Sequence, residues 1–217
     1  MPSFAILSLI CLGVVLVGIG GHAIVASPRG KGPIWLTVKG ILWAVRAAPS
    51  LIPRRDRSIV TWLARWAGLA AVGSIAVLFL TGFGCALLAY RLSGYLLMIH
   101  VTFGPVMVVA LAFLVLVRAQ THVPVQANAA PLLALLRFPA GPCPARADLG
   151  WVAKACFWAL ACLALPLTLS VVLSMFPLLG TDGQRWMEET HRYSALAFLL
   201  CALVYGYTAI RRRVVTT

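Results

Sequence analysis

Acidic side chains are scarce in this chain, in which 5 Asp and Glu stand against 18 Lys and Arg over 217 residues. Charged residues of both signs make up only 11% of the sequence, whereas in a soluble domain they make up about a quarter. Hydrophobic residues make up 62%, and the mean hydropathy is +0.97. This composition excludes an ordinary soluble domain and indicates an integral membrane protein. The excess of positive charge therefore indicates contact with membrane lipid rather than with nucleic acid.

Signatures of soluble enzymes are also lacking. The sequence contains no P-loop, no glycine fingerprint for dinucleotides, no H-E-x-x-H and no C-x-x-C pair. Five of the six cysteines lie in or beside apolar segments, where thiols behave as small hydrophobic groups, and only Cys143 lies in a connection. We therefore predict no catalytic residue in this chain.

Five apolar windows are long enough to cross a bilayer, which takes about 20 residues of helix. They cover residues 3–27, 66–90, 92–117, 155–180 and 193–210. The predicted fold is an all-α membrane bundle with an N-terminal transmembrane helix (1–27), a basic connection (28–64) and a four-helix domain (65–213). The small residues Val25, Ala26 and Ser27 would suit signal-peptide cleavage. However, the first window is long and has no basic residues before it, so we interpret it as a retained span.

The basic residues orient the bundle, because cytoplasmic connections carry most of the Lys and Arg. Residues 28–65, 118–154 and 211–213 hold all of them except Arg91, Arg185 and Arg192. This predicts an outside N-terminus and a cytoplasmic C-terminus. Within the inner connections, the apolar stretches 34–48 and 131–138 are too short to span and are predicted to lie in the membrane interface. The outer stretch 180–192 is predicted to be a charged loop.

Two histidines occupy matching positions in spans that run in the same direction. His100 lies near the start of the third span and His191 opens the fifth, so both imidazoles are predicted at the same depth near the outer face. Ionisable residues at such depth usually serve function. Two imidazoles at one level of a helix bundle are what a six-coordinate haem iron requires. The alternative is that each histidine is a hydrogen-bonded boundary residue.

Small residues follow both histidines on the same helix faces, namely Gly104 after His100 and Ala195 after His191. They would leave room for a flat macrocycle. Arg192 is the preferred cationic partner for haem propionates, with Arg185 and Arg91 as alternatives on the same side. The glycines of the second span, including Gly82 and Gly84, are predicted to permit close helix packing.

The remaining histidines, His22 and His122, share the inner end of the first and third spans. A second bis-histidine haem between them is the less favoured possibility, because His122 falls in the headgroup zone, where water can solvate it.

Residues 65–207 resemble the cytochrome b subunits of membrane formate dehydrogenases and related hydrogenases. The resemblance rests on LFLTGFG, on MIHVTFG, and on LSMFPLLG followed by THRYSALAFLL. It implies a four-helix bundle in the bacterial cytoplasmic membrane that carries haem b. It also implies electron transfer between a periplasmic catalytic partner and quinone, within a hetero-oligomeric complex. In that family the outer haem takes its ligands at the positions of His100 and His191.

The chain departs from the family on the inner side, where it has Arg65 and Tyr205 or Tyr207 at the positions of the usual histidines. One outer haem is therefore expected, and a quinone is left open. The rival interpretation is a haem-free anchor or assembly subunit whose histidines only make interhelical hydrogen bonds. Either way, catalysis on a soluble substrate would belong to a partner.

Overall fold

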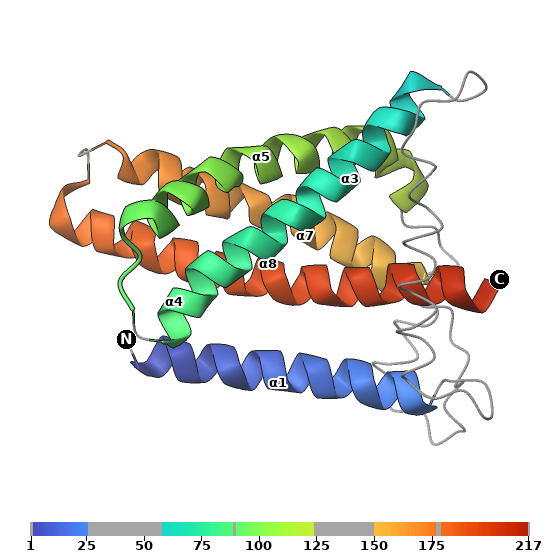
Figure 1. Ribbon diagram of the computed structural model, residues 1–217, viewed down its shortest axis with the longest axis horizontal. Coiled ribbons are helices and arrows are strands. Elements are labelled where there is room, and N and C mark those ends of the chain that lie inside the picture. Colours follow the sequence, from blue (N-terminus) through green and yellow to red (C-terminus); the bar gives the residue numbers. More distant parts are fainter. Residues whose placement is uncertain (1, 26–57, 89, 124–149, 177–178, 217) are drawn as a thin grey trace.

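The computed structural model describes residues 2–25, 58–88, 90–123, 150–176 and 179–216, and these are helical with short turns (Figure 1). Helix α1 covers Pro2–Val25, α3 covers Ile59–Leu78, α5 covers Gly94–Arg118, α7 covers Gly150–Ser174 and α8 covers Gly180–Thr216. A π-helix, η2 (Phe79–Phe83), and a short helix, α4 (Gly84–Leu87), continue α3, while a 3-10 turn, η3 (Ala119–His122), ends α5.

The predicted fold class is confirmed. Five helices in the described residues are long and apolar enough to span a membrane. Their outward faces carry large apolar side chains that are mostly exposed, such as Val17, Val109 and Leu116. Such a surface would be insoluble in water and suits contact with lipid tails.

Two helical hairpins form the bundle. α3, with η2 and α4, packs along α5, and α7 packs along α8. Gly94 and Gly180 begin the second helix of each hairpin with φ values of +58° and +62°, a conformation that favours glycine because it has no Cβ. α1 lies along one flank of the bundle, parallel to α8 (Figure 1).

Helices α1, α5 and α8 begin at one end of the bundle (left in Figure 1), and α3 and α7 run the opposite way. We call the end where α1, α5 and α8 begin the outer end, after the predicted orientation, and the opposite end the inner end.

Helix boundaries differ from the predicted spans mainly at the second, fourth and fifth. α3 begins at Ile59, inside the stretch predicted as a connection, and α7 covers Gly150–Ser174 rather than 155–180. The prediction of a loop at 180–192 was wrong, because α8 is continuous from Gly180 to Thr216. Asp182 in its first turn and an ion pair between Glu188 and Arg192 stabilise this polar part of the helix. The predicted interfacial helices at 34–48 and 131–138 lie outside the described residues.

Two hydrophobic clusters hold the hairpins together. The first joins Met107 of α5, Leu160 and Leu167 of α7, and Phe198 of α8. The second joins Phe83 of η2 to Leu196 and Leu199 of α8, and Phe4 and Leu12 of α1 pack against it. The second cluster therefore attaches α1 to both hairpins.

Candidate functional site

His100 of α5 is held by Thr81 of the π-helix within the same hairpin. The Thr81 hydroxyl lies 2.8 Å from the carbonyl oxygen of Val77 and 2.8 Å from His100 Nδ1. Because the carbonyl can only accept, the hydroxyl donates to Val77 and accepts from the imidazole. His100 therefore carries its proton on Nδ1 and has its lone pair on Nε2.

The π-helix brings a second residue against His100. A Cβ added at Gly82 would lie 3.0 Å from His100 Cε1, closer than side chains normally pack. The absence of a side chain at Gly82 therefore makes room for the imidazole ring of His100. Single π-turns inside α-helices recur at functional sites, and this one places Thr81 and Gly82 together against one histidine.

His191 of α8 is held in the same way by α7, the other helix of its own hairpin. Its Nδ1 lies 3.3 Å from the Leu167 carbonyl oxygen and 3.3 Å from Ser170 Oγ, and the Ser170 hydroxyl donates to that same carbonyl at 2.9 Å. The carbonyl can only accept, so the imidazole donates from Nδ1. His191 likewise has its lone pair on Nε2.

The two imidazoles come together where the hairpins meet, in an edge-on ring contact. Their ring centroids are 6.4 Å apart, with the ring planes inclined by 70°. Imidazole–metal bonds are about 2 Å long and the ring centre lies about 1 Å behind the bonding nitrogen, so two imidazoles on one metal have centroids about 6 Å apart. The centroid spacing of His100 and His191, 6.4 Å, is close to that length.

The other residues predicted to lie near His100 and His191, which we call the outer pair, have different surroundings. A Cβ at Gly104 would meet nothing within 4 Å, so the helix surface there has free space. Ala195 packs against both hydrophobic clusters. Arg192 forms an ion pair with Glu188, one turn earlier on α8.

His22 and His122 meet different faces of α8. His22 lies 2.7 Å from the Tyr207 hydroxyl through Nδ1, and Arg211 lies 2.8 Å from its Nε2. His122 stacks on Phe157 with ring centroids 4.0 Å apart, and its Nε2 lies 3.4 Å from the Tyr205 hydroxyl. Tyr205 and Tyr207 are two residues apart on a helix and so project from different faces. The structure places each inner histidine against its own tyrosine.

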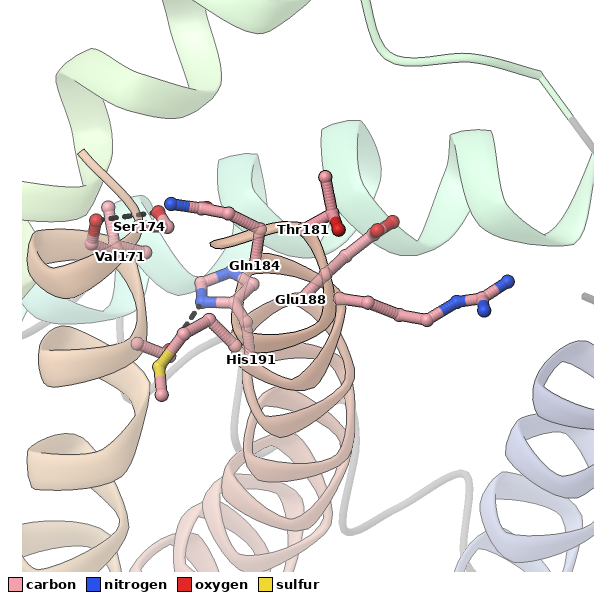
Figure 2. A pocket seen from close by; sticks show the side chains of 9 residues that line it. Val171, Ser174, Thr181, Gln184, Glu188 and His191 are labelled. Carbon is pink, nitrogen blue, oxygen red and sulfur yellow. Dashed lines mark hydrogen bonds between the residues drawn. The ribbon is translucent and has the colours of Figure 1, made fainter. Parts of the chain in front are cut away.

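An open pocket of about 520 Å³ adjoins His191 at the outer end (Figure 2). It lies between the end of α7 and the beginning of α8. Most of its lining surface is apolar, although seven of the nine lining residues carry polar groups. The lining consists of Ser170, Val171, Ser174, Thr181, Gln184, Arg185, Met187, Glu188 and His191. Among the described residues, no group of three or more His, Cys, Asp or Glu side chains could hold a bare metal ion.

Thr81 was missed by the sequence analysis. In the sequence, Thr81 is recognisable only as a polar residue beside a glycine inside an apolar span. The periodicity of an α-helix does not predict the π-turn that brings Thr81 within hydrogen-bond distance of His100. Gly82 was predicted to serve helix packing, whereas its close neighbour is the histidine ring.

No family model, curated protein or solved structure matches the chain. The resemblance to the formate dehydrogenase cytochromes therefore rests on the quoted motifs alone.

Proposed function

We propose that this protein is a membrane cytochrome b subunit in which His100 and His191 would hold the iron of one haem b. The observation that carries the proposal is that each imidazole is fixed through Nδ1 by its own hairpin and that the two ring centroids lie 6.4 Å apart. A protonated, hydrogen-bonded Nδ1 leaves Nε2 to coordinate, and such second partners are usual for metal-binding histidines.

Haem, once bound, supplies one-electron chemistry, and the chain supplies its environment. His100 and His191 would hold the iron from opposite hairpins, which would make the bundle rather than a single helix the binding unit. Thr81 and the Leu167 carbonyl orient the two ligands and raise their basicity. Leu167, whose carbonyl holds His191, also belongs to the hydrophobic cluster of Met107, Leu160 and Phe198.

The proposed role follows from the position of this site near one end of the bundle. With the N-terminus outside, His100 and His191 lie near the periplasmic face of a bacterial cytoplasmic membrane. A periplasmic redox protein or catalytic subunit can then exchange electrons with the site. Quinone or another subunit of a hetero-oligomeric complex completes the electron path.

A reduced-minus-oxidised absorption spectrum of the purified full chain tests this function. We expect the α-band of a six-coordinate haem b in the wild type and its loss in His100→Ala and in His191→Ala. His122→Ala serves as the matched control and retains the band. A haem-replete preparation without this band would overturn the proposal and leave the haem-free anchor as the better account.

A further inference from the structure

The pocket beside His191 continues outward along the helix face that carries this histidine. Gln184 and Glu188 precede His191 by seven and three residues and so share its side of α8. Ser170 and Ser174 line the opposite wall from α7. In Figure 2, the labelled side chain of Gln184 reaches from α8 toward Ser174 of α7. A group bound at His191 would thus lie beside a recess that carries several polar side chains and leads toward the outer end of the bundle.

Hydrogen bonds within the lining leave donors for an anionic ligand. Gln184 uses one amide hydrogen to bond the Phe176 carbonyl at 3.2 Å, which fixes its amide beside the end of α7 and leaves its second hydrogen. The Thr181 hydroxyl also lines the recess and can donate. The polar wall can therefore solvate a carboxylate as it leaves the apolar interior.

The charges around the recess also suit an anion. Glu188 is the only acidic residue in the lining, and its carboxylate is paired with Arg192. That pairing offsets part of the repulsion that Glu188 would exert on a second carboxylate. Arg185 is the one cationic side chain among the lining residues, whereas Arg192 is not among them.

We propose that this recess binds the propionate carboxylates of the haem and that Arg185 is their counter-charge. The inference rests on the proposed function, since it takes His191 as a haem ligand. It differs from the sequence-based choice of Arg192, whose structural partner is Glu188. Arginine suits the role because its planar guanidinium donates two parallel hydrogen bonds to one carboxylate.

Titration of the haem-depleted full chain with haem and with haem dimethyl ester tests the assignment. The ester has the same iron and macrocycle but no carboxylates. Loss of a charged hydrogen bond weakens binding about tenfold or more, so Arg185→Gln should lower the affinity for haem by that factor and leave the affinity for the ester unchanged. Arg185→Lys should recover part of the loss, and Arg91→Gln, an exposed outer arginine outside the recess, should behave as wild type.

The possible results separate the two proposals. If Arg185→Gln binds haem as tightly as wild type, or loses affinity for haem and ester equally, the propionate assignment is overturned while histidine ligation stands. If the wild-type chain binds neither compound with a six-coordinate spectrum, the cytochrome function itself fails. The reduction potential gives a second readout. Loss of the Arg185 charge near the iron should lower the potential, and an unchanged value would contradict the assignment.

Discussion

The two imidazoles of the outer pair are held by partners of unequal strength. His100 has one hydrogen-bond partner at Nδ1, Thr81 at 2.8 Å, whereas His191 lies 3.3 Å from both Ser170 Oγ and the Leu167 carbonyl. Thr81→Val should therefore leave a half-buried N–H of His100 without an acceptor. Second-partner losses of this kind lower metal affinity by about 10- to 100-fold. We expect a decrease of this size in haem affinity, measured by titration at the Soret band.

Ser170→Ala is the matched control for Thr81→Val, because His191 keeps the Leu167 carbonyl as its acceptor. Its effect on haem affinity should be clearly smaller. Equal losses in the two variants would show that hydrogen bonding at Nδ1 does not set the strength of ligation. Thr81→Ser keeps the hydroxyl and should bind haem nearly as wild type does.

Gly82 and Gly84 offer a second comparison, since they are neighbours in the same segment with different surroundings. A Cβ at Gly82 would lie 3.0 Å from His100 Cε1, but one at Gly84 would meet nothing within 4 Å. Gly82→Ala should displace the imidazole and weaken or distort low-spin ligation in the optical spectrum. Gly84→Ala should leave the spectrum unchanged. Normal spectra from both variants would contradict the contact between Gly82 and His100.

Helix α1 is attached to α8 at the inner end by a chain of polar contacts. Arg211 can donate to His22 Nε2 at 2.8 Å while His22 Nδ1 donates to the Tyr207 oxygen at 2.7 Å. Tyr207→Phe removes that acceptor. It should lower the free energy of unfolding by about 1 kcal/mol, the net worth of a typical hydrogen bond. Haem content should stay at the wild-type level, and a fall would implicate His22 in haem binding. Thermal unfolding and haem content of the purified variant check both expectations.

At the scale of helices, the sequence allowed the existence, the number and the alternating direction of the spans to be predicted, because a helix needs a long apolar run to cross a bilayer. The alternation was enough to place His100 and His191 at the same end of the bundle. Which end faces the cytoplasm stays a prediction from the basic connections. The beginning of α8 could not be predicted in this way, because Glu188 and Arg192 look like loop residues until their pairing on a helix is seen.

Side-chain partners were harder to predict than spans. The π-helix η2 contacts α5, and no local sequence pattern indicated that Thr81 would meet His100 there. His22 and His122 were correctly assigned to the inner ends of their helices, but depth alone does not fix the face of α8 that each meets. In the structure, His22 meets the face of α8 that carries Tyr207, and His122 meets the face that carries Tyr205.

At the scale of the whole molecule, each of the two hairpins is a pair of helices packed along each other, and His100 and His191 lie where the two hairpins meet. His100 and its partner Thr81 belong to the first hairpin, and His191 and its partners belong to the second. An iron held by both would link the two hairpins. Haem should therefore stabilise the bundle against unfolding as any ligand specific to the folded state does.

The central claim, one haem held by the outer pair, is tested most directly by the haem-to-protein ratio of the purified full chain. We predict one haem b per chain in the wild type and in the His22→Ala, His122→Ala double variant. The His100→Ala, His191→Ala double variant should retain essentially none. A ratio of two in the wild type, or haem retained without the outer pair, would contradict the account.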